Sequence, residues 1–233
     1  MKSSQHACGR ELLADLAALV WPVMCVGCGA ADRALCDNCQ EKLAAARPLV
    51  IESPLARVPA YARGPYRDVL RETIVAYKHD GRAGFAKTLG AQLAHPLGAA
   101  VRLASASPLI IAAPSRAAQV RKRGFRHVEA VLKVALKSIP DPATHVRALR
   151  STRGRRGQVG LQAAARARNA SRVAVRHRFR ETLRGREVIV VDDIMTTGAT
   201  VRAACDVLTQ AGARVVAVAV LAAVAYEGTP ERS

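Results

Sequence analysis

The sequence predicts an α/β fold in which helices flank a parallel sheet, with a small cysteine-rich segment near the N-terminus. Two observations lead to this fold class. Short runs of β-branched residues without a polar side chain, the pattern of strands buried on both faces, alternate with helical stripes of apolar residues. Ahead of them stand two Cys-x-x-Cys pairs, a spacing typical of zinc sites.

Length and composition limit the number of domains and the kind of ligand. The 233 residues allow one sizeable domain and a small appendage. The net charge of +18 and the pI near 10.8 favour phosphorylated ligands, nucleic acid or anionic membrane surfaces as partners. No stretch approaches the roughly 20 apolar residues of a membrane span. We therefore expect a cytoplasmic protein with reduced cysteines.

The chain is predicted to have three parts. Residues 1–46 comprise an N-terminal helix and the zinc-binding segment, and residues 47–66 form a proline-rich linker or hairpin. Residues 67–233 form the main domain, in which Pro96 could break one helix. Helices are expected over residues 66–78, 84–102, 128–139 and 201–208, and buried strands over 109–113, 188–191 and 214–220.

The N-terminal segment is predicted to bind a structural zinc ion. Cys25 and Cys28 form the first pair, and Cys36 and Cys39 form the second. Each pair can turn two thiolates toward one ion, so the four cysteines match a closed tetrahedral site. The ion would replace the hydrophobic core that so short a segment cannot build. Buried free thiols or a redox pair are the alternatives.

The stretch Glu187–Thr200, EVIVVDDIMTTGAT, contains the candidate ligand site. Its apolar run ends in two carboxylates, Asp192 and Asp193, and an acidic turn and a hydroxyl-rich loop are expected before the next helix. Ligands of open α/β sheets bind beyond the carboxyl ends of the strands, and a helix N-terminus can hold a phosphate. Adjacent carboxylates can accept hydrogen bonds from two vicinal hydroxyls or steady a phosphate-bound Mg²⁺. The stretch thus indicates a ribose 5-phosphate ligand; an ordinary turn with solvated acids is the alternative.

VIVVDDIMTTGAT resembles the phosphoribosyl pyrophosphate (PRPP) signature of type I phosphoribosyltransferases. The resemblance implies that Asp192 and Asp193 bind the ribose hydroxyls of PRPP, which would enter with Mg²⁺. It also implies that the following loop binds the 5′-phosphate. The loop residues are Thr196, Thr197, Gly198, Ala199 and Thr200.

Basic residues elsewhere in the chain could contact the pyrophosphate of PRPP. Arg116 follows the predicted strand 109–113, whose carboxyl end lies on the same side of a parallel sheet as Asp192. Lys78 is a second candidate. Residues 147–180 are dense in arginine and contain no acid. This segment could close over a pyrophosphate or follow a nucleic-acid backbone.

Nearly the whole chain resembles the ComF family, named for a competence protein of DNA uptake. The cysteine pairs, Tyr77–Gly81 and Arg123–Phe125 fall in family order before the PRPP loop. The resemblance implies a type I phosphoribosyltransferase fold with a Rossmann-like sheet. One departure is that Arg126 and His127 stand where the family usually has Asn-Gln. Further matching positions are Gln158, Leu161, Arg166 and Asn169.

Two functions of different classes remain open. As an enzyme, the protein would transfer the phosphoribosyl group of PRPP to a nitrogen base, largely by positioning and charge stabilisation. No residue identifies the acceptor base or a catalytic group, and His127 is a candidate general base. As a non-catalytic competence factor, the protein would use the site as a sensor or scaffold and bind single-stranded DNA and DNA-uptake proteins.

Overall fold

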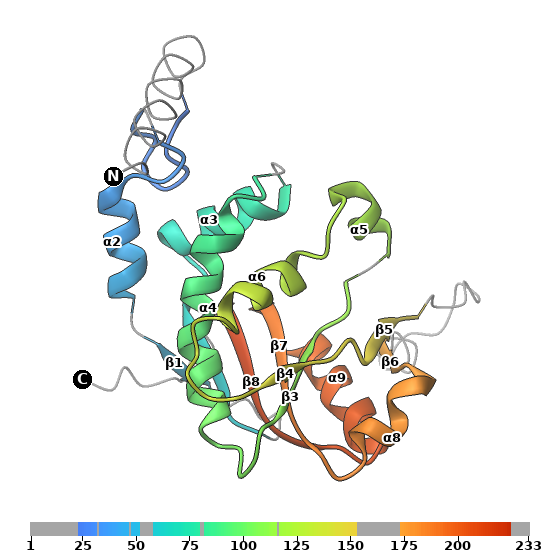
Figure 1. Ribbon diagram of the computed structural model, residues 1–233. Helices are drawn as coiled ribbons and strands as arrows, with labels where there is room; N and C mark the ends of the chain where they lie inside the picture. Colours follow the sequence, from blue (N-terminus) through green and yellow to red (C-terminus); the bar gives the residue numbers. More distant parts are fainter. Residues whose placement is uncertain are drawn as a thin grey trace, which may run out of the picture.

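A six-stranded sheet runs through the computed structural model (Figure 1). Among its described strands every pairing is parallel except that of the first two. In spatial order the strands are β1 (Leu49–Ile51), β2 (Ala60–Pro65), β8 (Arg214–Ala223), β7 (Glu187–Met195), β3 (Leu109–Ala112) and β4 (Thr144–His145). The structure describes residues 23–31, 33–46, 48–51, 58–79, 82–115, 117–152 and 173–224.

Helices cover both faces of this sheet. Along β7, Ile189 and Val191 pack into one apolar cluster, whereas Val188 and Val190 pack into another on the opposite face. Helices α2 (Asp37–Ala45), α3 (Asp68–His79), α4 (Phe85–Val101) and α6 (His127–Ala135) contribute to the first cluster, and α8 (Arg180–Leu183) and α9 (Ala199–Gln210) to the second. The predicted α/β fold class with a mostly parallel sheet is therefore confirmed.

Smaller elements complete the described part of the chain. Strands β5 (Leu149–Ser151) and β6 (Val173–Val175) form a separate antiparallel pair. Helix α5 (Ala117–Arg123) precedes α6, and a 3₁₀ turn, η1 (His177–Phe179), precedes α8. Over the described ranges, no helix combines the length and apolar character that a bilayer crossing requires.

Strand β7 is longer than the sequence predicts. The expected acidic turn is absent from the described structure, because β7 continues through the two aspartates to Met195. Its pairing with β8 also continues, from Asp192 opposite Val220 to Met195 opposite Ala223. These backbone pairs override the low strand propensity of aspartate. Successive strand residues point to opposite faces, so the two carboxylates start from different sides of the sheet.

Pro96 does not break helix α4, which runs unbroken from Phe85 to Val101. Proline inside a helix costs about 3 kcal/mol, and burial of the surrounding turns offsets that cost. Leu93 and Leu97 on either side of it are almost fully buried. Helix α4 also lies close to α6, since a Cβ at Gly90 would be only 2.4 Å from the Cβ of Val134.

The proline-rich 47–66 segment contributes two strands to the sheet. In its described part, β1 pairs with β2 as an antiparallel hairpin. Strand β2 then pairs in parallel with β8, from Ala60 opposite Val218 to Pro65 opposite Ala223. The segment thereby extends the edge of the main sheet and approaches the end of helix α2.

Arg63 on β2 holds the end of helix α2. Its side chain is buried, with the residue 2% exposed, and its Nε donates to Gln92 Oε1 at 2.7 Å. Its Nη2 donates to the carbonyls of Leu43 and Ala44, both at 2.8 Å, and its Nη1 donates to the carbonyl of Ala46. The last carbonyls of a helix lack intrahelical partners and carry a partial negative charge. The guanidinium therefore fastens the cysteine segment to the sheet.

We expect Arg63→Met to lower the free energy of unfolding by about 3 kcal/mol, because several buried acceptors lose their donor at once. Arg67→Met is the matched control. Arg67 forms only an exposed ion pair with Asp68, so its loss should change stability by about 0.5 kcal/mol or less. Urea denaturation followed by circular dichroism measures both values. Equal stabilities of the two variants would contradict the role given to Arg63.

Candidate functional site

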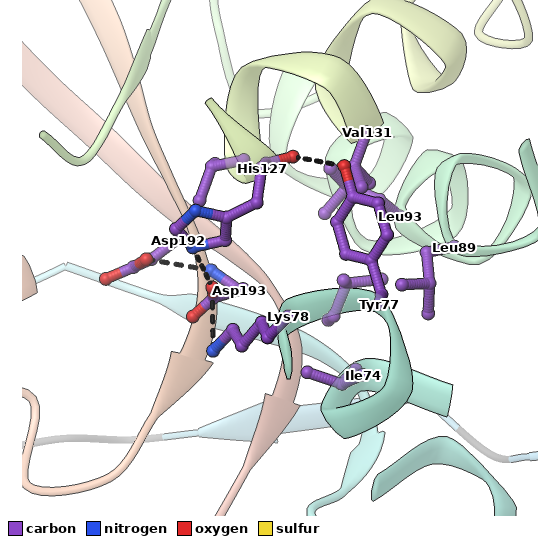
Figure 2. A pocket seen from close by; sticks show the side chains of 11 residues that line it. Ile74, Tyr77, Lys78, Leu89, Leu93, His127, Val131, Asp192 and Asp193 are labelled. Atoms are coloured by element: carbon purple, nitrogen blue, oxygen red, sulfur yellow. Dashed lines mark hydrogen bonds and ion pairs between the residues drawn. The ribbon is translucent and has the colours of Figure 1, made fainter. Parts of the chain in front are cut away.

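Two helices and one strand bring a cluster of charged side chains together at the carboxyl end of β7. Lys78 Nζ from α3 lies 2.8 Å from Asp193 Oδ2, and His127 Nε2 from α6 lies 2.5 Å from the same oxygen (Figure 2). These side chains are only 11–15% exposed. The backbone N–H of Asp193 donates to Oδ1 of Asp192 at 2.8 Å. The protein thus holds both aspartates in defined positions.

The cluster lines a hollow between the sheet and helices α3, α4 and α6. The rest of the wall is mainly apolar, and Figure 2 shows Tyr77, Leu93 and Val131 on the side away from the aspartates. Apolar surroundings strengthen the attraction between the charged groups, because little water screens them. The other lining residues are Ile74, Leu89, Val128 and Leu221.

The surroundings shift the pKa values of the two aspartates in opposite directions. Burial, together with the charge of Asp193, raises the pKa of Asp192 to about 7. Burial acts on Asp193 in the same direction, but the hydrogen bond from His127 and the charge of Lys78 outweigh it and lower the pKa of Asp193 to about 2. Near neutral pH, Asp193 is therefore ionised, whereas Asp192 is present in both its protonated and its ionised form.

Polar contacts from Arg123, Tyr77 and Ser115 hold His127 in position. Arg123 Nε donates to the carbonyl of Lys78 at 2.8 Å, and Arg123 Nη1 lies 3.0 Å from His127 Nδ1. The Tyr77 hydroxyl donates to the carbonyl of His127 at 3.0 Å (Figure 2). Ser115 Oγ lies 3.4 Å from His127 Nδ1. The C-terminal end of α3 and the N-terminal end of α6 are therefore joined by polar contacts.

The predicted phosphate loop passes from β7 into helix α9. Gly198 is the N-cap residue of α9 and has a φ of +71°, a left-handed conformation that glycine adopts without strain. Helix α9 begins at Ala199, whose N–H faces Thr197 Oγ1 at 3.4 Å. The first N–H groups of a helix have no carbonyl partner within it. The loop thus presents backbone donors next to the aspartate pair.

The structure does not reach every residue that the sequence singles out. Arg116 and residues 153–172 lie outside the described residues. Lys78 lies beside Asp193, so it belongs to the aspartate cluster. The family resemblance includes Tyr77 and Arg123 among its motif positions, but it gave neither residue a role in the site. Their contacts with His127 depend on where the ends of two helices meet, and no local periodicity records that.

Basic side chains gather near the antiparallel pair β5–β6. Burial and the charges of Arg178, Arg126, Arg147 and Arg150 lower the pKa of Arg176. Glu129 on α6 pairs with Arg147 at 2.5 Å and with Arg126 at 3.9 Å. Apart from Arg126, these arginines belong to the described part of the arginine-rich segment 147–180. This arginine cluster gives the surface beside α6 a positive charge.

The four cysteines of the two predicted pairs meet in one cluster. Their Sγ atoms all lie within 4.8 Å of one another, and those of Cys28 and Cys36 are 3.6 Å apart. Tetrahedral zinc with bonds of about 2.3 Å requires sulfur separations of about 3.8 Å. The N–H of Cys36 lies 3.4 Å from Cys25 Sγ, and backbone donors lower the pKa of Cys25 to about 6 against the effect of burial. The cluster could therefore hold a zinc ion.

The cysteine cluster packs against the first turns of helix α3. A Cβ at Gly27 would lie 2.8 Å from Cys39 Sγ and 3.1 Å from Val69 Cγ1, so only glycine fits between them. Cys25 and Cys39 share one apolar cluster with Val69 and Leu70. The segment is therefore continuous with the main core.

Comparison with known families supports part of the expected identity. Residues 122–232, slightly less than half of the chain, match the model of a family described as "Phosphoribosyl transferase domain". This match supports the resemblance to type I phosphoribosyltransferases over that region. It does not confirm the narrower ComF assignment, which stays a prediction.

Individual relatives cover short or distant parts of the chain. A stretch of 37 residues is 62% identical to an adenine phosphoribosyltransferase of Kineococcus radiotolerans, covering 16% of this chain and 20% of that protein. The chain thus spans about a fifth of the length of this curated relative. A hypoxanthine phosphoribosyltransferase of Trypanosoma cruzi aligns at a TM-score of 0.38 with 13% identity, over 64% of this chain and 68% of that one.

A second solved structure is the glutamine PRPP amidotransferase of B. subtilis complexed with ADP and GMP. It aligns at a TM-score of 0.35 with 22% identity, over 57% of this chain and 25% of that one. None of the three proteins named in these comparisons is described as a competence or DNA-uptake protein.

We expect the purified protein to contain about one zinc ion per chain, since four thiolates complete a tetrahedral site. The double variant Cys25→Ser, Cys28→Ser should lose the metal and unfold at a lower temperature. Cys205→Ser is the matched control, because Cys205 is buried on α9 and not part of the cluster. Elemental analysis and thermal unfolding check both expectations. Equal zinc content in the double variant and the wild type would reject the site.

Proposed function

We propose that the protein binds PRPP at the aspartate pair and the start of helix α9, and transfers its phosphoribosyl group to a nitrogen base. The observation that carries this proposal is the place of Asp192 and Asp193. They lie near the carboxyl end of the buried strand β7, line a small hollow and are followed by a short loop that leads into helix α9. The phosphoribosyl transferase match over residues 122–232 supports the same reaction class.

Each aspartate offers one oxygen to a ligand. Within the described part of the chain, the protein holds Asp193 through Oδ2 and Asp192 through Oδ1. The remaining oxygens, Oδ1 of Asp193 and Oδ2 of Asp192, can each accept a hydrogen bond from one of two vicinal hydroxyls. A ribose carries such a pair of hydroxyls, whereas a deoxyribose lacks one of them. The pair would therefore favour ribose over deoxyribose ligands.

The phosphate end of the ligand would lie on the loop 196–200. The N–H groups at the start of α9 and the partial positive charge of that helix stabilise a phosphate dianion. Gly198 in its left-handed conformation lets the backbone approach the phosphate closely. Mg²⁺ bound to the pyrophosphate of PRPP would supply charge neutralisation at the leaving group.

The residues of the chain would act on the reaction mainly by charge and position. The bond between ribose C1 and the pyrophosphate oxygen breaks with its electron pair on oxygen. A bond from C1 to the base nitrogen forms, and the base loses a proton to water. Lys78 Nζ has three N–H donors, so it can keep its contact with Asp193 and still face the leaving pyrophosphate. Arg116 remains a further candidate from the sequence.

The competence alternative gains no support from the comparisons. It rests on the ComF resemblance and on the net charge of +18. The arginine cluster near β5–β6 fits a polyanion of any kind, so it does not favour DNA over a phosphorylated small molecule.

The direct test is calorimetric titration with PRPP and Mg²⁺, followed by a screen of nitrogen bases for pyrophosphate release. We expect Asp192→Asn and Asp193→Asn each to weaken PRPP binding about tenfold or more, since each removes a charged acceptor. Asp206→Asn on the exposed side of α9 is the control and should bind as the wild type does. Unchanged affinity in both site variants would place the ligand elsewhere.

The affinity for PRPP should also depend on pH through Asp192. Because its pKa is raised to about 7, the carboxylate is mostly ionised at pH 8 and mostly protonated at pH 6. Protonation removes an acceptor, so the affinity should fall by up to about tenfold as the pH drops through 7. The phosphates of PRPP titrate in the same range and affect every variant.

The Asp192→Asn variant isolates the contribution of the protein to this profile. Dividing the wild-type affinity by that of the variant at each pH cancels the titration of the ligand. A ratio that stays constant from pH 6 to pH 8 would show that Asp192 does not titrate at the site.

A further inference from the structure

His127 lies between a group that can only donate hydrogen bonds and a group that, when ionised, can only accept them. On one side, Arg123 Nη1 lies 3.0 Å from its Nδ1. On the other side, Asp193 Oδ2 lies 2.5 Å from its Nε2. A guanidinium has five N–H donors and no acceptor, and it stays protonated in proteins. The two nitrogens of the imidazole therefore face different partners: a hydrogen-bond donor lies at Nδ1 and an acceptor lies at Nε2.

This arrangement selects one protonation form of the imidazole. Nδ1 must offer its lone pair to Arg123, so it carries no proton. The single proton is then on Nε2, the nitrogen that lies 2.5 Å from Oδ2 of Asp193. A doubly protonated ring would turn an N–H toward the N–H groups of Arg123, and the other neutral tautomer would also leave two lone pairs facing each other at Asp193.

We infer that Arg123 is a positioning residue, which fixes His127 as the neutral Nε2–H tautomer and thereby orients the carboxylate of Asp193 for the ribose hydroxyls. The orientation of Asp193 toward a ribose rests on the proposed function. The choice of tautomer does not, since it follows from the contacts of the protein alone.

Different residues balance the charge of Asp193 and orient the side chains around it. Lys78 balances the negative charge of Asp193 through its ammonium group, 2.8 Å away. The carbonyl of the same Lys78 accepts a hydrogen bond from Arg123 Nε at 2.8 Å, and Tyr77 holds the carbonyl of His127. Arg123 therefore fixes the imidazole of His127 and the backbone of Lys78 relative to each other. The imidazole and the ammonium then both reach Oδ2 and leave Oδ1 of Asp193 for the ligand.

The tautomer is measured directly by long-range ¹H–¹⁵N correlation spectra of the full-length protein, with His127→Gln identifying the ring. We expect one protonated nitrogen, Nε2, and one unprotonated nitrogen, Nδ1, in the wild type near neutral pH. In Arg123→Met, Nδ1 loses its donor and a population with the proton on Nδ1 should appear. Arg126→Met removes the same charge from an ion pair with Glu129 and should leave the tautomer unchanged.

The role in ligand binding is tested by comparing three replacements of His127 in PRPP titrations. A glutamine amide N–H can take the place of imidazole Nε2–H, whereas an asparagine amide reaches only the place of Nδ1 and an alanine provides no donor. We expect His127→Gln to bind PRPP within about threefold of the wild type, and His127→Asn and His127→Ala about tenfold more weakly. A purely structural role would not separate glutamine from asparagine in this way.

The two measurements fail independently. A wild-type spectrum with both nitrogens protonated, or with the proton on Nδ1, overturns the inference even if PRPP binds. Equal PRPP affinities for the glutamine, asparagine and alanine variants overturn the positioning role. Absence of PRPP binding by the wild type overturns the proposed function, and the spectrum of the wild type, which needs no variant to fold, still decides the tautomer.

Discussion

The buried carboxylate of Asp193 is the constraint on which the candidate site depends. An ionised carboxylate that is only 12% exposed loses most of its hydration, so the protein must replace water with fixed partners. Lys78 and His127 provide them from two helices that are separate in sequence. The ends of α3 and α6 must therefore meet at the end of β7. Their meeting creates the hollow that the aspartates line.

Sequence patterns predicted those features that follow from local periodicity. The run Val188–Val191, the stripe beginning at Val201 and the paired cysteines correspond to β7, α9 and the cysteine cluster. The patterns failed where partners distant in sequence decide the outcome. Strand β7 extends beyond its apolar run because its backbone pairs with β8 up to Met195. Helix α4 continues past Pro96 because the residues around the proline are buried in the core. The contacts of Arg123 depend on the packing of helix ends.

At positions 126 and 127 the chain departs from the pattern of the family that its sequence resembles, and the two side chains lie in different surroundings. A family glutamine at position 127 would provide an amide N–H, and His127 can provide an imidazole N–H to Asp193 instead. Either side chain at position 127 can thus offer an N–H donor toward Asp193. Arg126 faces Glu129, so its added charge is partly balanced outside the aspartate cluster.

Helix α3 explains why a cysteine segment is joined to a domain that already has a large core. Val69 in its first turn packs beside Gly27 and Cys39, and Lys78 in its last turn contacts Asp193. The cysteine cluster packs against the first turn of α3, and Arg63 holds the C-terminal end of α2. Because a helix transmits position along its length, fixing its first turn restricts where Lys78 can lie. The cysteine segment can therefore influence the candidate site through α3, which carries Val69 at one end and Lys78 at the other.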